Sequence, residues 1–215
     1  MRSVFRGMTV AAALAATSPW AHSAFAADAT EATYGRIAGD VGIAVGAGAV
    51  AAHRFRAEGE VRLRYLDTAG VFVTYEDGFG DASASEATRL LAAGLELRPF
   101  FLFRWLRGFE VHRAWFDLAV DSLGLELGAW TSLVQDGALQ SAQGLQAGVG
   151  LELPIEPAAS GPWIGLHGGI RWGARALTIG RFDDEGDRSV YLAVTLAWHQ
   201  IVAAHVVDLG DRAPQ

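Results

Sequence analysis

The feature that most constrains this chain is an alternation of apolar and non-apolar residues with a period of two. It is clearest from Val61 to Glu76, where one phase holds Val61, Leu63, Tyr65, Ala69, Val71, Val73 and Tyr75. The other phase holds Arg62, Arg64, Thr68, Gly70, Thr74 and Glu76. Successive side chains of a β-strand point to opposite faces, so this period predicts a strand with one apolar face. Because the phase does not break, we predict a single long strand over residues 61–76.

The same alternation recurs along most of the chain and predicts an all-β fold. Seven segments have strand character, and they cover residues 34–52, 58–77, 86–105, 112–134, 141–155, 161–178 and 187–206. Single-chain bacterial barrels have even strand numbers, so we expect about eight strands. The apolar phase changes at Asp121-Ser122, where either a bulge or a strand-splitting turn would fit. Alternatively, Pro99 ends one strand and another begins after it.

The residues opposite the apolar face favour a closed barrel over a β-sandwich. Many of them are glycines, namely Gly42, Gly46, Gly48, Gly144, Gly148, Gly150, Gly165 and Gly169. A sandwich strand turns its polar face to bulk water, which accommodates large polar side chains. A narrow barrel turns that face to a crowded lumen, where glycine makes room and charges have to pair. The pattern therefore predicts an antiparallel up-and-down transmembrane β-barrel.

High hydrophobicity without a membrane helix supports the same prediction. Apolar residues make up 51% of the chain, and the mean hydropathy is +0.22. The longest apolar candidate, Val41 to Ala52, is glycine-rich and well short of the roughly 20 residues that a membrane helix needs. A closed barrel surrounded by lipid would accommodate this apolar surface.

The N-terminus predicts export. Arg2 and Arg6 flank the start of a short apolar stretch, and Ala24-Phe25-Ala26 has the small-x-small pattern of a signal-peptidase site. We therefore predict a signal peptide over residues 1–26 and an outer-membrane β-barrel domain over residues 27–215.

Composition and spacing exclude several classes of function. The formal net charge of −7 argues against nucleic acid as a partner. The absence of cysteine excludes a thiolate nucleophile, a disulfide and a cysteine-ligated zinc ion. The histidines lack zinc-ligand spacings, and the acidic stretch Asp183 to Asp187 lacks the spacing of a calcium loop. We expect neither a cofactor nor a bound metal.

The predicted inner face carries charges of both signs. These residues are Arg62, Arg64, Glu76, Glu96, Arg98, Glu126, Glu152 and Arg171. A barrel of about eight strands is only wide enough for its own side chains, so we expect these charges to pair and plug the lumen. A gated or selective pore is the alternative.

Aromatic residues near the predicted strand ends suggest contact with lipid headgroups. The tryptophans concerned are Trp105, Trp115, Trp130, Trp163, Trp172 and Trp198. Tryptophans at this level form girdles in membrane barrels, whereas in a soluble fold they would belong to the core. The stretch from Phe100 to Trp115 mixes phenylalanine with arginine. It is either an interfacial segment or a strand end followed by a loop, and we favour the strand end.

Together, the signal peptide, the alternating strands and the aromatic belts resemble small outer-membrane β-barrel proteins of Gram-negative bacteria. The stretches Asp121 to Trp130 and Gly161 to Trp172 also look like those of predicted barrels from high-GC genomes. The resemblance implies a monomer embedded in outer-membrane lipid. It implies a structural or surface-interaction role, with an unidentified surface partner, and no enzymatic activity.

Two other functions are compatible with the sequence. The first is a soluble periplasmic or secreted lipocalin-like barrel that binds an apolar ligand. The second is an outer-membrane hydrolase that modifies lipid, a class in which a serine stands two residues after a catalytic histidine. Here His167 is followed by Gly168-Gly169 and His199 by Gln200-Ile201, so that pattern is absent.

Overall fold

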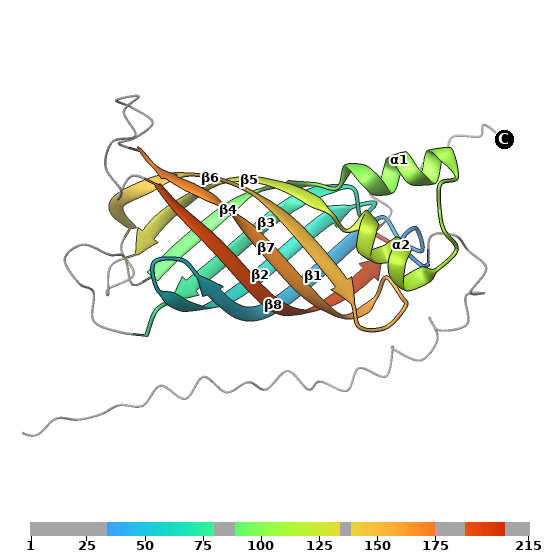
Figure 1. The fold of residues 1–215 in the computed structure, drawn as a ribbon, viewed down its shortest axis with the longest axis horizontal. Helices are drawn as coiled ribbons and strands as arrows, with labels where there is room; N and C mark the ends of the chain where they lie inside the picture. Colours follow the sequence, from blue (N-terminus) through green and yellow to red (C-terminus); the bar gives the residue numbers. More distant parts are fainter. Residues whose placement is uncertain (1–33, 80–88, 134–138, 175–187, 205–215) are drawn as a thin grey trace, which may run out of the picture.

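The chain forms a closed barrel of eight antiparallel strands in which each strand pairs with the next (Figure 1). The computed structural model describes residues 34–79, 89–133, 139–174 and 188–204. The strands are β1 (Val41–Ala51), β2 (Phe55–Tyr65), β3 (Ala69–Asp77), β4 (Arg89–Leu97), β5 (Gly124–Leu133), β6 (Leu139–Pro154), β7 (Gly161–Gly173) and β8 (Arg188–Val202). The seam closes between β1 and β8, in a register that runs from the pair Val41–Val202 to the pair Ala51–Leu192. The predicted all-β, up-and-down, eight-stranded barrel is confirmed.

The strand missing from the sequence prediction lies inside residues 61–76, so the prediction of one long strand there was wrong. The chain reverses between β2 and β3 at Leu66 and Asp67, which adopt positive φ angles of 48° and 52°. The N–H of Thr68 donates to the carbonyl of Tyr65 at 3.0 Å. Tyr65 pairs with Ala69, and both residues have odd numbers. Odd residues therefore face outward on both strands, and the alternation continues through the turn without a change of phase.

Both positions proposed for the extra strand are helical instead. Helix α1 (Pro99–Arg107) and helix α2 (Ala114–Asp121) lie between β4 and β5. Pro99 occupies the first turn of α1, where its missing N–H costs nothing, and Gly108 ends the helix with a left-handed φ of 61°. The phase change at Asp121-Ser122 marks the end of α2 rather than a turn or bulge between strands. The segment from Phe100 to Trp115 is accordingly neither a strand end nor a simple loop.

The barrel has an inverted polarity, with apolar side chains outside and charged side chains inside. Outward residues such as Val45, Leu127 and Leu196 are 54–60% exposed. Inward residues such as Arg62 and Glu76 are at most 1% exposed. The glycine-rich face predicted from the sequence is the inward one.

Inward glycines make room for large side chains on neighbouring strands. Phe72 on β3 points toward β4 and β5, where Gly94 and Gly128 lie opposite each other. A Cβ atom on Gly94 would lie 2.8 Å from Cζ of Phe72 and 2.3 Å from the carbonyl oxygen of Leu127. A Cβ atom on Gly128 would lie 3.1 Å from the same Cζ. Close approach of this kind explains why glycine is tolerated inside these strands.

The two ends of the barrel differ in their connections. At one end, hereafter the cap end, lie residues 34–40, the β2–β3 turn, α1, α2 and the β6–β7 turn at residues 155–160 (Figure 1). Backbone hydrogen bonds join these segments, for example from Leu66 to Asp40 at 2.8 Å and from Ala159 to Tyr34 at 3.1 Å. The opposite end holds the short β1–β2 turn and the connections at residues 78–88, 134–138 and 174–187.

Two sequence predictions fall on parts of the chain that are not described. The signal peptide at residues 1–26 and the acidic stretch at residues 183–187 lie outside the described residues. Neither α1 nor α2, the helices of the described part, is long and apolar enough to cross a membrane.

Replacing Gly94 with alanine should destabilise the barrel by about 1–3 kcal/mol, because the new methyl group overlaps backbone as well as Phe72. The measurement is urea unfolding in detergent micelles followed by tryptophan fluorescence. Gly59→Ala on β2 is the matched control, since a Cβ there meets nothing within 4 Å. Equal unfolding midpoints for the two variants would contradict the close packing described here.

Candidate functional site

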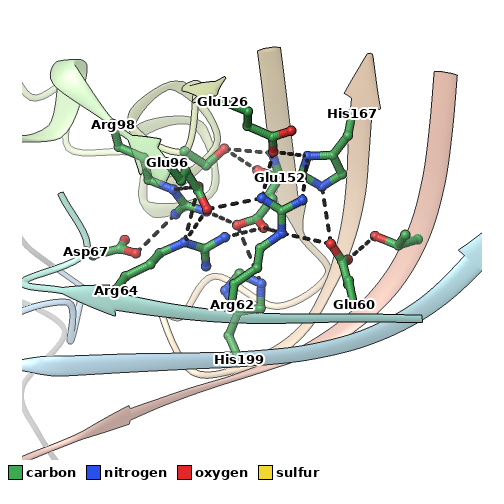
Figure 2. A network of polar contacts seen from close by, with 12 residues as sticks. Glu60, Arg62, Arg64, Asp67, Glu96, Arg98, Glu126, Glu152, His167 and His199 are labelled. Carbon is green, nitrogen blue, oxygen red and sulfur yellow. Dashed lines mark hydrogen bonds and ion pairs between the residues drawn. The ribbon is translucent and has the colours of Figure 1, made fainter. Parts of the chain in front are cut away.

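The candidate site is the lumen, where a network of ion pairs surrounds Arg62 (Figure 2). Strand β2 places Arg62 in the middle of the inner face, with Glu60 and Arg64 in the same phase. The Arg62 guanidinium donates to Glu126 at 2.6 Å, to Glu60 at 2.7 Å and to Glu96 at 3.1 Å. Its planar fork of five N–H groups allows one side chain to join carboxylates from three strands.

The network continues toward the cap end through Arg64 and Arg98. Arg64 donates to Glu152 at 2.6 Å and to Glu96 at 3.2 Å. Arg98, which follows β4, donates to Glu96 at 2.8 Å and also to Glu152. A further hydrogen bond of 3.1 Å joins Arg98 to Asp67 in the β2–β3 turn. The charges on β2, β4 and β6 are thus connected to the rim of the barrel (Figure 2).

A second cluster lies nearer the opposite end. Arg171 on β7 forms an ion pair with Glu76 on β3 and donates to the Gln146 side chain at 3.0 Å. Arg56 also donates to Glu76, at 3.1 Å. The Arg171 guanidinium lies 4.2 Å from the centre of the Tyr191 ring, a cation–π contact.

The structure places each of the predicted lumen residues inside the barrel, buried and paired. These residues are Arg62, Arg64, Glu76, Glu96, Arg98, Glu126, Glu152 and Arg171. The two clusters divide them, with Glu76 and Arg171 in the second and the others in the first. Side chains therefore occupy the lumen at two levels, as expected for a barrel of eight strands.

Sequence reasoning missed several members of the first cluster. Glu60 is buried and accepts hydrogen bonds from Arg62 and from the Thr195 hydroxyl at 2.5 Å. His167 Nδ1 lies 2.9 Å from Glu126 Oε1 and 3.1 Å from the Arg62 guanidinium. His199 Nε2 lies 3.5 Å from Glu152. The signal was available, because each residue lies in the inward phase of its strand.

A separate polar cluster holds the helices on the cap end. Asp117 of α2 accepts hydrogen bonds from the Tyr34 hydroxyl at 2.9 Å and from the N–H groups of Val111 and Arg113 at 3.0 and 3.1 Å. Arg104 of α1 forms an ion pair with the same carboxylate. Four donors thus converge on one buried carboxylate, which fixes both helices and the segment between them.

These contacts shift two pKa values in opposite directions. Burial and the hydrogen bond to Asp117 raise the pKa of Tyr34 to about 12. Burial alone would raise the pKa of Asp117, but its hydrogen bonds from Val111, Arg104 and Tyr34 hold the pKa below 3.8. Asp117 is therefore ionised, and Tyr34 is neutral, at neutral pH.

Asp121 links the same helices to the chain before β1. It accepts from Arg36 at 2.6 Å and from Arg104 at 2.7 Å, and both ion pairs are buried. The Arg36 guanidinium also lies 4.5 Å from the centre of the Phe101 ring. The cap is therefore bound to the barrel's first strand through charge as well as through packing.

Direct contacts also join α2 to the barrel wall. The Ser122 hydroxyl donates to the Glu152 carbonyl at 2.6 Å and accepts from the Glu152 N–H at 2.9 Å. The Trp115 indole donates to the Pro154 carbonyl at 2.6 Å. Leu118 packs in a buried cluster with Ala159 and Trp163. Glu152 therefore contacts the lumen network with its side chain and the cap with its backbone.

Four of the six predicted interfacial tryptophans lie outside the lumen. Trp198 on β8 points outward and is exposed, and Trp172 on β7 lies in the outward phase and is half-buried. Trp105 and Trp115 are exposed on or beside the helices of the cap end. Their contact with lipid headgroups stays a prediction.

The prediction of an outward position was wrong for Trp163 and Trp130. Trp163 lies in the inward phase of β7, is buried, and stacks on the His199 ring with 4.7 Å between centroids. Trp130 is half-buried and lies in the same phase as Gly128 and Ser132, which face inward. Its indole donates to the Leu145 carbonyl at 3.2 Å. The alternation carried the signal, because Trp163 shares its phase with Gly165 and His167, and Trp130 shares its phase with Glu126 and Gly128.

Among the described residues, no group of three or more His, Asp or Glu side chains could hold a metal ion. The ion-paired glutamates are already satisfied by guanidinium groups. What the arrangement can do is fill and stiffen the lumen.

Comparison with known proteins gives limited information. No family model matches the chain, and no curated protein matches it. Among solved structures, the N-terminal β-barrel domain of Pseudomonas aeruginosa OprF is 8% identical, with a TM-score of 0.43, over 74% of this chain and 97% of that one. Ail, the attachment invasion locus protein of Yersinia pestis, solved with the heparin analogue sucrose octasulfate, is 13% identical, with a TM-score of 0.34, over 74% and 96%. The fold assignment rests on the strand pairing of this chain itself.

Replacing Arg62 with methionine should destabilise the barrel by about 3–5 kcal/mol, because buried carboxylates lose their shared partner. Arg89→Met is the matched control. Arg89 forms a partly exposed ion pair with Asp77 at 3.1 Å, so its replacement should cost at most about 1 kcal/mol. Urea unfolding in micelles measures both. An Arg62 variant as stable as the Arg89 variant would show that the network adds little.

Replacing Asp117 with asparagine should cost about 2 kcal/mol at neutral pH, because an amide cannot accept all four donors. The Asp117 pKa is lowered on folding, so its stabilising effect is complete above pH 3.8 and is lost as the pH falls through the lowered value. The difference between wild-type and variant unfolding free energies should therefore shrink in acid. Glu156→Gln, at an exposed carboxylate of the same end, is the matched control and should change the unfolding free energy at neutral pH by at most about 0.5 kcal/mol.

Proposed function

We propose that this chain is a non-enzymatic barrel of the Gram-negative outer membrane with a structural or surface-interaction role. The observation that carries the proposal is the inverted polarity of the barrel. A continuous outer surface of leucine, valine and isoleucine side chains would be costly in water and is what lipid requires. Charged side chains inside complete the inversion.

The second part of the proposal is that the lumen is sealed. The cluster around Arg62 and the cluster around Arg171 occupy the interior at two levels, and α2 with its polar contacts lies across the cap end. An ion crossing this lumen would have to break buried ion pairs in series. Sealing fits a protein that works through its surfaces rather than through transport.

The alternatives are less well supported by the same residues. A lipocalin-like cup needs an apolar cavity to bind an apolar ligand, whereas the middle of the lumen here is occupied by charged side chains that are bonded to one another. A lipid hydrolase needs a histidine that can reach substrate. His167 is engaged with Glu126 and Arg62, and His199 is stacked on buried Trp163.

The orientation follows from the connections. Outer-membrane barrels have short turns on the periplasmic side and longer loops on the outer side. Apart from residues 98–123, which form α1 and α2, the connections of the cap end are the turns at residues 66–68 and 155–160. The opposite end has two short connections, at residues 52–54 and 134–138, and two longer ones, at residues 78–88 and 174–187. We therefore place the cap end in the periplasm, and any surface partner would meet the opposite end.

Cell fractionation with a conductance measurement tests this proposal. We expect the protein in the outer-membrane fraction, released only by detergent, with heat-modifiable gel migration and a mass that corresponds to a chain starting at Ala27. Purified protein inserted into planar bilayers should add no single-channel steps. Recovery in the soluble periplasmic fraction would contradict the membrane assignment, and regular conductance steps would contradict the sealed lumen.

A further inference from the structure

Helix α1 exposes more apolar surface than its contacts with the barrel require. It buries only Phe101 and Arg104. The apolar side chains that it and the following residues expose are Phe100, Leu102, Phe103, Trp105, Leu106 and Phe109, hereafter the α1 apolar surface. Leu106 is 68% exposed. A contiguous patch of this kind marks an interaction site.

The α1 apolar surface continues the outer surface of the barrel. Leu97, the last residue of β4, points outward and is exposed, and α1 begins two residues later. Leu123 and Leu125, where the chain returns to β5, are exposed as well. If lipid surrounds the strands, the same lipid reaches the start of α1.

The distribution of these side chains around α1 favours a fluid partner. At 100° per residue, Phe100, Leu102, Phe103, Trp105 and Leu106 cover most of the helix circumference except the stripe of Phe101 and Arg104. A second protein surface would cover one face only. Acyl chains can surround every exposed face of a short helix.

Cationic side chains stand where lipid phosphates would lie. Within the described residues, no carboxylate lies at ion-pair distance from Arg107 or Arg113, and both arginines are exposed. Arg107 instead lies over the Phe103 ring, at 5.8 Å from its centre. Figure 1 shows α1 leaving the cap end and continuing away from the strands, and Arg107 is the last residue of this helix. Moving along α1 from the strands outward, apolar residues therefore come first and a cation follows, which is the order expected on leaving a bilayer.

We propose that α1 is an interfacial anchor that inserts its apolar surface into the phospholipid leaflet at the cap end. The exposed apolar residues of α1 contact acyl chains, and Arg107 and Arg113 pair with lipid phosphates. This inference rests on the proposed membrane location of the barrel. It assigns to the insertion between β4 and β5 a lipid-binding role, in addition to its contacts with the barrel rim.

Spin labelling in vesicles tests the anchor. The chain contains no cysteine, so each single-cysteine variant carries one label at a known position. Leu106→Cys, Leu127→Cys and Glu156→Cys are each labelled with a nitroxide and reconstituted into vesicles of phosphatidylcholine and phosphatidylglycerol. Leu127 reports the middle of the outer surface, and Glu156 reports an exposed turn at the cap end. Collision rates with oxygen and with a water-soluble nickel chelate give the depth of each label.

The expected result is an oxygen-to-nickel ratio for the label at position 106 that is severalfold higher than at position 156 and approaches that at position 127. A ratio equal to that at position 156, with lipid-like values at position 127, would overturn the anchor alone. Nickel-accessible labels at position 127 would overturn the membrane location and the anchor together. Dipolar broadening at position 106 would mean that α1 packs against a second copy, which also overturns the proposal.

A second measurement tests the two cations. Arg107→Gln combined with Arg113→Gln should shift the label at position 106 toward water in vesicles that contain phosphatidylglycerol, and the shift should be smaller in pure phosphatidylcholine. Pairing with phosphates would be supported if the label at position 106 loses its lipid-like oxygen-to-nickel ratio in the double arginine variant and keeps it in the protein with both arginines. An unchanged ratio in both vesicle types would remove Arg107 and Arg113 from the proposal.

Discussion

Charges inside a barrel cost several kcal/mol each unless they are paired and hydrogen-bonded, and this requirement organises the interior of the protein. Arg62 donates hydrogen bonds to three carboxylates, and Glu152 accepts hydrogen bonds from Arg64 and Arg98. Such long side chains fit only where the neighbouring positions are small. Gly150 shows this directly, because a Cβ there would lie 2.6 Å from Nδ1 of His167 and 3.1 Å from Oε1 of Glu126. The glycine-rich inner face and the ion-pair network are therefore two aspects of one packing solution.

The same requirement extends to the cap end, where two helices replace a simple turn. Asp117 and Asp121 are buried, and their positive partners come from Arg36 before β1 and Arg104 on α1. Ser122 then binds both backbone groups of Glu152. The lumen and the cap share Glu152, so the two polar clusters are mechanically connected through one residue of β6.

Much of this architecture could be predicted from the sequence because a period of two has a direct structural meaning. The inward phase of β2 to β7 identified the charges that the structure brings together. Glu60 and His167 were missed although they occupy that phase, because Glu60 precedes the clearest stretch of alternation, which begins at Val61, and a single histidine has no distinguishing pattern. The turn at Leu66 and Asp67 was missed for a different reason. Asp67 is a common turn residue but Leu66 is not, and the register preserves the alternation across the turn.

Helices α1 and α2 could not be recognised from periodicity, because each is only two turns long and rich in residues that also favour strands. Their stability comes from tertiary contacts such as Asp117 with Arg104, which join residues that the sequence does not mark as partners. The stack of Trp163 on His199 belongs to the same class, because it joins two residues that the sequence does not mark as partners.

The lumen contacts also bear on how the barrel assembles. Strands β2 and β5 are separated by two other strands, so in a flat sheet Arg62 and Glu126 would lie about 14 Å apart at about 4.8 Å per strand. In the barrel their side chains meet at 2.6 Å. This ion pair is a product of curvature and does not form in a flat sheet. The lumen pairs that join distant strands therefore form as the sheet curls toward its closed shape, and in a flatter sheet the same charges stay apart on a hydrated inner face.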